Sequence, residues 1–310
     1  MKKLLFLVSG LILFFSCTNE EASQPHQNAI SYNLKAKEAS GIPKLTNNDT
    51  IIQYFNYYLS VSYLHSNGLN QVRDYLIANK KNASYSGLRT VVRDYSAKNG
   101  ISIDPGQPGD TSTFMHFLLK DSNAENQANQ RQLSALLVKY TPVFATFFNT
   151  IEKAVISKPS IKKEELVSLF QKSLVSSDFK KSDPIAQQSL LLASAIYVDS
   201  YFYWTNTKNT DLWGPAFPVT IGGGTLVTTG WPPTRADIIR YVKIDAIGAG
   251  VGAVGGAVGG AAYGAVTALL TGGVLSPAIL VGAVAGAIGG SISGAITASG
   301  TAALMDYYGL

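Results

Sequence analysis

Near the C-terminus, glycine recurs at every fourth residue in two neighbouring segments, and this spacing constrains the fold more than any other feature of the sequence. On an α-helix, residues four apart lie on one face, so each segment would carry a groove that lacks side chains. Two such grooves allow helix backbones to approach closely. The series are Gly248, Gly252, Gly256, Gly260 and Gly264, then Ala278, Gly282, Gly286, Gly290, Gly294 and Ala298. The break at 271–277 predicts a hairpin of two helices whose grooves face each other.

The predicted hairpin is uncharged, because residues 246–305 contain no Asp, Glu, Lys, Arg or His. Each glycine inside a helix costs about 1 kcal/mol relative to alanine in water, whereas a backbone in a bilayer has no water to bond and must form helix. Each segment is also long enough, at about 1.5 Å per residue, to cross a hydrocarbon core of about 30 Å. The sequence therefore favours membrane insertion assisted by self-association through the zipper, with burial against a soluble helical domain as the alternative.

Aromatic and basic residues flank the hairpin on the side where both of its ends emerge. Aromatic rings suit the boundary between lipid and water, and arginine and lysine suit lipid phosphates. Membrane lipid is therefore an expected partner. We expect membrane-interface positions at Trp231, Arg235, Arg240, Tyr241, Lys243, Tyr307 and Tyr308.

The N-terminus has the pattern of an export signal. Two lysines precede an apolar stretch over residues 4–15, which is shorter than a membrane-spanning helix. The chain's single cysteine, Cys17, follows, and residues 13–17 resemble the lipobox of bacterial lipoproteins. The acidic residues at 20–21 resemble the surface-export signal of Bacteroidota lipoproteins. These resemblances imply a lipid-anchored protein of the cell envelope, acylated on Cys17 with chains such as palmitate, at the outer membrane and exposed on its surface.

Between the N-terminal segment and the hairpin, apolar residues recur with helical spacing. We expect an all-α fold, with a bundle of six to eight helices before the hairpin. Gly68 is expected to end the first helix and Gly100 to follow the third. Ser160 is expected to cap a later helix of the bundle, the run 182–184 to start its last helix, and Thr234 to cap the helix that leads into the hairpin. The aromatic residues at 197–204 are expected in the core, with an interfacial patch as the alternative.

These patterns predict the organisation of the whole chain. The N-terminal tether is too polar to fold alone, and the connector before the hairpin is rich in proline and glycine. The expected segments are a signal peptide at 1–16, a lipidated tether at 17–48, a helical domain at 49–205, a connector at 206–243 and the glycine-zipper hairpin at 244–306.

The sequence shows no constellation of catalytic residues. His65 and His116 are isolated, lack the spacing of metal ligands, and are each expected at the surface or the edge of the core. The run 250–255 matches a dinucleotide-binding pattern, but no acidic residue follows it before Asp306. A net charge of +5 without a basic run does not favour nucleic acid. We therefore expect no enzymatic activity, cofactor, metal or nucleic-acid partner.

The paired glycine series resembles the glycine-zipper two-helix segments of bacterial envelope lipoproteins and of pore-forming bacteriocins. The resemblance covers about residues 245–305 only. It implies a membrane-active effector or a structural lipoprotein of the envelope, with membrane lipid and further copies of the chain as partners. The soluble packing of the hairpin leaves a third interpretation, a glycan- or partner-binding lipoprotein in which the hairpin is buried.

Overall fold

The computed structural model describes residues 44–79, 82–101, 143–144, 146–217, 233–271 and 275–308, and among these it does not describe the side chains of 257–283, 305, 307 and 308. The expected signal peptide, Cys17, the tether before residue 44, His116 and Trp231 lie outside the described residues.

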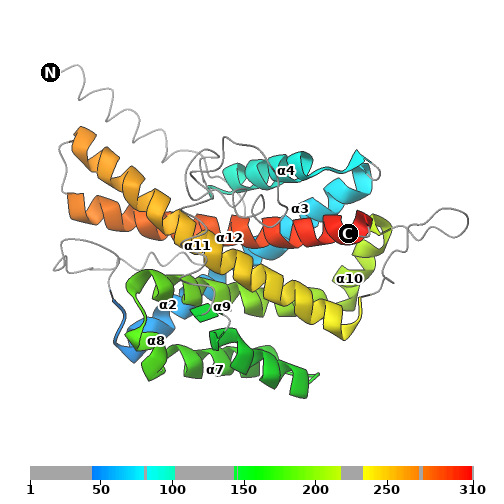
Figure 1. Ribbon diagram of the computed structural model, residues 1–310, viewed down its shortest axis with the longest axis horizontal. Coiled ribbons are helices and arrows are strands. Elements are labelled where there is room, and N and C mark those ends of the chain that lie inside the picture. Colours follow the sequence, from blue (N-terminus) through cyan, green and yellow to red (C-terminus); the bar gives the residue numbers. More distant parts are fainter. Residues whose placement is uncertain are drawn as a thin grey trace, which may run out of the picture. The chain divides into compact units, whose positions relative to one another are not determined.

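The fold is all-α, as the helical spacing predicted, and every regular element in the described part of the chain is a helix (Figure 1). Residues 146–157 are also helical. The α-helices are α2 (Asn48–Val61), α3 (Tyr63–Asn79), α4 (Tyr85–Lys98), α7 (Lys163–Leu174), α8 (Ser177–Lys181), α9 (Pro184–Thr205), α10 (Thr207–Trp213), α11 (Arg235–Thr271) and α12 (Leu275–Tyr308). A short 3-10 helix, η3 (Gly214–Ala216), follows α10.

Local side-chain chemistry fixes several of the helix ends. Asp183 caps α9 by accepting a hydrogen bond of 3.0 Å from the backbone N–H of Ala186, which satisfies one of the free donors of the first turn. At the start of α11, the hydroxyl of Thr234 accepts a bond of 3.3 Å from the backbone N–H of Asp237, so the predicted cap at Thr234 is confirmed, and the Asp237 carboxylate accepts in return from the backbone N–H of Thr234 at 2.8 Å. The start of α7 differs from the prediction, because Lys162 and not Ser160 is the N-cap residue.

The two glycines predicted to end helices behave differently. Gly100 adopts a φ of +67° just after α4, the left-handed conformation that glycine adopts without strain. Gly68, by contrast, lies buried inside α3, so the prediction that it ends a helix is wrong. A Cβ at Gly68 would collide with the side chain of Ile296, and 3.1 Å would separate it from the ring of Tyr95. This glycine is therefore a contact point between helices, and the break after the first helix falls at Ser62 instead.

The hairpin formed by α11 and α12 packs against the helices that precede it. Helix α11 makes its most extensive contacts with α12 and then with α9, while α12 also contacts α3 and α4. We call α3, α4 and α9 the cradle. The described residues from 44 onward belong to one compact unit, and one core cluster includes residues of the helical domain and of the hairpin.

Large aromatic side chains form the core between α9 and the helices on its other side. The ring of Tyr197 lies 5.6 Å from that of Phe148, nearly parallel to it, and 5.3 Å from that of Phe170. Phe170 also approaches Phe55 of α2, at 6.1 Å. The prediction that the aromatic residues at the end of α9 lie in the core is confirmed for Tyr197, Tyr201, Tyr203 and Trp204, each at most 4% exposed.

Candidate functional site

The two helices of the hairpin meet along glycine backbones. A Cβ at Gly248 would lie 2.6 Å from both the carbonyl oxygen of Gly294 and the Cβ of Ala298. Since real Cβ contacts are never this short, no residue larger than glycine fits unless the helices separate. The structure therefore places these glycines where the sequence spacing placed them, on facing grooves.

The same arrangement repeats one turn and two turns further along α11. A Cβ at Gly252 would collide with the carbonyl of Gly290, and one at Gly256 would collide with the carbonyl of Gly286. Each step of four residues along α11 is matched by a step of four residues backwards along α12, as antiparallel helices require. We call this contact the seam. Gly260, Gly264 and Gly282 continue the sequence pattern, but their side-chain positions lie outside the described part of the hairpin.

Glycines outside the four-residue series make a second kind of contact, from the hairpin to the surrounding helices. A Cβ at Gly250 would lie 2.9 Å from the ring of Phe144, and one at Gly300 would lie 2.8 Å from Leu88 and 3.1 Å from Val72. The four-residue spacing in the sequence does not include these two glycines. They instead bring the hairpin close to large side chains of other helices.

Beside the seam, α11 carries a buried carboxylate. Asp245 has no exposed surface. One of its oxygens, Oδ2, accepts a hydrogen bond of 2.5 Å from Ser200 and one of 3.2 Å from the indole N–H of Trp204, both on α9. The other oxygen, Oδ1, accepts from the hydroxyl of Ser299 on α12. Its hydrogen-bonding capacity is thus met by side chains from both the cradle and the hairpin, as a buried charge requires.

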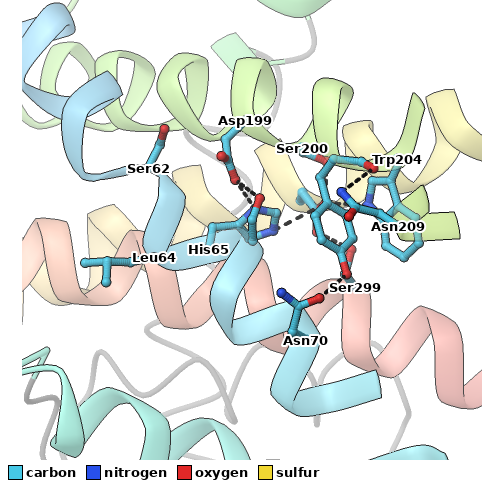
Figure 2. A network of polar contacts seen from close by, with 12 residues as sticks. Ser62, Leu64, His65, Asn70, Asp199, Ser200, Trp204, Asn209 and Ser299 are labelled. Atoms are coloured by element: carbon cyan, nitrogen blue, oxygen red, sulfur yellow. Dashed lines mark hydrogen bonds and ion pairs between the residues drawn. The ribbon is translucent and has the colours of Figure 1, made fainter. Parts of the chain in front are cut away.

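His65 completes this cluster and is entirely buried, and Figure 2 shows it beside Asp199. Its Nδ1 lies 3.0 Å from Oδ2 of Asp199, and its Nε2 lies 3.4 Å from Oδ2 of Asp245. Ser66 donates to Asp199 at 2.5 Å. Burial by itself lowers the pKa of His65, but the two carboxylates outweigh it and raise the pKa to about 9. His65 is therefore a protonated counter-ion between two carboxylates at neutral pH.

The placement of His65 corrects the expectation of an isolated histidine at the surface or core edge. Sequence reasoning missed the cluster because its three charged members are widely separated along the chain. One signal pointed toward it. Asp245 is the last charged residue before sixty uncharged residues, 246–305, and a lone carboxylate next to a glycine-rich helix that packs tightly needs a buried partner.

The residues expected at a membrane interface are in part bound within the protein. Tyr241 is buried with its ring 4.6 Å from that of Trp204, and its hydroxyl donates to Asp306 at 2.6 Å. This placement differs from the predicted interface position, because packing against Trp204 removes the ring from solvent. Burial raises the pKa of Tyr241 well above its usual value, and nearby Asp306 adds to the shift.

The basic residues at the base of the hairpin also have protein partners. Arg240 forms an ion pair with Asp306, Lys243 lies 3.1 Å from Glu152, and Arg235 donates to the backbone carbonyl of Val155 at 2.5 Å. These contacts close the base of the hairpin against itself and against the helix at 146–157. The side chains of Tyr307 and Tyr308 lie outside the described part of the structure.

The contacts within the cluster suit a structural role, because they do not pair a serine hydroxyl with the histidine. The hydroxyls of Ser66 and Ser200 each donate a hydrogen bond to a carboxylate, and neither donates to His65. Within the described residues, no group of histidine, cysteine, aspartate and glutamate is arranged to hold a metal ion. The cluster is suited to holding α11, α9 and α3 together.

No family model, curated protein or solved structure matches this chain. Among the described residues, no helix combines the length and the apolar character needed to cross a membrane. The fold and the site define an all-α protein in which a glycine-zipper hairpin is fastened to a cradle by a buried charge cluster.

Proposed function

We propose that this protein is a lipid-anchored protein of the bacterial cell envelope that presents part of its glycine-zipper hairpin to a lipid bilayer. The observation that carries the proposal is the seam, in which Gly252 and Gly256 face the backbone carbonyls of Gly290 and Gly286. Contacts of this kind do not depend on the exclusion of water, so they hold two helices together equally well in lipid. The predicted lipobox at Cys17 would keep the domain close to a membrane surface.

The two halves of the hairpin have different surroundings. The proximal half, residues 235–256 and 284–308, contains the buried seam glycines and Asp245 and packs in the core. The distal half, residues 257–283, is uncharged, and in Figure 1 its orange segments reach beyond the green and cyan helices. The distal half is therefore the part that we propose enters lipid.

The length of the distal half limits how deeply it can enter a bilayer. Residues 257–271 would measure roughly 22 Å at about 1.5 Å per residue, which is less than the hydrocarbon core of about 30 Å. With the proximal half packed in the cradle, the distal half would enter one leaflet and would not cross the bilayer. Complete crossing would require part of the proximal half to leave the core.

Environment-sensitive fluorescence would test the lipid contact. The mature chain with Cys17→Ala would be labelled with NBD at Ala268→Cys, in the distal half, and separately at Leu212→Cys, on α10, where the native side chain is 54% exposed. We expect vesicles of phosphatidylethanolamine and phosphatidylglycerol to shift the emission to the blue at position 268 and leave position 212 unchanged. If neither label responds, the proposed membrane contact is wrong.

A second candidate function has its own supporting observation. Because Asp245 bonds both to the cradle and to α12, the proximal half of the hairpin is built into the core, and this favours a lipoprotein that binds a partner or glycan and uses the hairpin as a structural element. This candidate predicts no response at position 268.

Dye release would separate the two membrane interpretations. Leakage of vesicles loaded with carboxyfluorescein would support a membrane-active effector. Lipid contact at position 268 without leakage would support a structural protein of the envelope.

A further inference from the structure

The two carboxylate oxygens of Asp245 contact two different parts of the protein, the hairpin itself and the cradle. Oδ1 accepts a bond from Ser299, so it ties α11 to α12 within the hairpin. Oδ2 accepts bonds from Ser200 and Trp204 of α9 and faces His65 of α3, so it ties the hairpin to the cradle. Separation of the hairpin from the cradle would break every contact to Oδ2 and leave the contact to Oδ1 intact.

The remaining contacts divide in the same way. Inside the hairpin, the seam consists of glycine backbones and the Cβ of Ala298, and the nearest atoms around Gly248, Gly252 and Gly256 all belong to α12. Between hairpin and cradle, the contacts are made by side chains, such as the ring and methyl contacts around Gly68 and Gly300 and the bond of 2.9 Å between Ser96 of α4 and Ser293 of α12. The hairpin can therefore leave the cradle with its internal contacts preserved.

Because of the cluster, several contacts between hairpin and cradle would be lost together when the two separate. The side chains of His65 and Asp245 have no exposed surface, and that of Asp199 is 16% exposed. A buried charge is tolerated only while its partners satisfy it, so a small displacement of α11 removes several hydrogen bonds and the counter-ion together. We therefore expect this interface to be either closed or open, with few arrangements between the two states.

We infer that the cluster of His65, Asp199, Ser200, Trp204 and Asp245 is a latch, and that the hairpin opens away from the cradle as one preformed unit when the contacts to Oδ2 of Asp245 break. As a route to deeper membrane insertion, this inference rests on the proposed function. The opening itself concerns this chain alone and is measurable without lipid.

Cysteine labelling measures the opening. In the Cys17→Ala background, Ser293→Cys places a thiol in the interface between hairpin and cradle, at a position that is 5% exposed. Leu174→Cys, on α7, reports the opening of the rest of the core, because α7 packs on α2, α8 and α9. The rate at which a thiol reagent labels each buried thiol is proportional to the population of the open form.

Two matched substitutions on the same carboxylate distinguish a latch from an ordinary buried polar network. Ser200 and Ser299 are both fully buried and both donate to Asp245. Ser200→Ala removes a bond that exists only in the closed form, so we expect the thiol at position 293 to be labelled at least tenfold faster. Ser299→Ala removes a bond that persists in the open hairpin, so we expect a change of less than threefold. In both variants, labelling of the thiol at position 174 should change by less than threefold.

Three results would overturn the latch. Equal acceleration by the two alanine variants would show that the bond from the cradle and the bond within the hairpin contribute equally to keeping the interface closed. Acceleration at position 174 together with position 293 would show that the cluster supports the whole core. Unchanged labelling at position 293 in Ser200→Ala would show that the contacts to Oδ2 do not limit opening. None of these outcomes depends on vesicles, so the latch and the membrane proposal can fail independently.

Discussion

The seam of the hairpin and the aromatic core beside α9 achieve close packing in opposite ways. At the seam, Gly252 and Gly256 have no side chain, and the partner's backbone occupies the space where a Cβ would stand. In the aromatic core, Phe170 fills its space with a ring that lies within 6.3 Å of four other rings. The seam is therefore sensitive to added atoms, and the aromatic core is sensitive to atoms removed.

This difference also separates what the two regions contribute. The aromatic core buries large apolar surface, which stabilises the domain in water. The seam buries little side-chain area, and its contacts come from close backbone packing and not from the hydrophobic effect. Because the seam adds little hydrophobic stabilisation, the charged and polar cluster is needed to hold the hairpin on the cradle. Four measurements can test this difference between the seam and the aromatic core.

The largest effect is expected from a bulky side chain in the seam. Gly256→Leu would place four carbon atoms where the backbone of Gly286 lies, and we expect a loss of about 5 kcal/mol or more, or no folded protein. Urea unfolding followed by circular dichroism would measure it. Gly100→Ala is the matched control, since no atom lies within 4 Å of the added methyl group and only its φ of +67° is unfavourable, at about 1–2 kcal/mol. A leucine at 256 that costs no more than this control would contradict the seam.

The aromatic core should respond to removal. Phe170→Ala leaves a cavity among Phe55, Phe148 and Tyr197, and we expect a loss of about 3–5 kcal/mol in urea unfolding. Phe170→Leu keeps most of the volume and should cost clearly less. Equal costs for the two variants would indicate that the ring contacts, and not the filled volume, stabilise this region.

The charge cluster should make stability depend on pH in the alkaline range. Burial lowers the pKa of His65, but Asp245 and Asp199 raise it to about 9, above its ordinary value of 6.5. A raised pKa stabilises the fold fully below pH 6.5, and this contribution is lost as the pH rises through about 9. The difference corresponds to roughly 3 kcal/mol.

Urea unfolding at pH 6, 7.5 and 9.5 would measure this loss, with His65→Gln as the reference for other groups that titrate. The parent should lose more stability than the variant over this range. Parallel pH profiles for the two proteins would show that His65 is not charged in the folded state.

The smallest effect is expected at the base of the hairpin. Arg240 is 45% exposed where it pairs with Asp306, and exposed pairs contribute about 0–1 kcal/mol. Arg240→Gln should therefore cost less than about 1 kcal/mol and should lose that effect in 1 M salt. A loss comparable with that of Phe170→Ala would mean that the pair fastens the hairpin as strongly as the buried cluster does.

Much of the fold follows from local patterns in the sequence. The spacing of the glycines predicted two facing helices, and the structure brings Gly248, Gly252 and Gly256 to the backbone of α12. Thr234, Asp183 and Gly100 mark helix ends by side-chain or backbone chemistry that acts within a few residues. These features are predictable because the α-helix repeats every 3.6 residues and its ends need caps, whatever the helix packs against.

Tertiary packing, and no local pattern, sets which helices the hairpin contacts and which charged residues meet at its side. Gly68 looked like a helix end and is a contact for Ile296, and His65 looked isolated although Asp199, 134 residues away, lies 3.0 Å from it. A residue's own sequence neighbours carry no information about such partners. The physical reason is that α3, α9 and α11 are brought together by the burial of their apolar faces, and the positions of their polar residues along those faces then determine which side chains meet.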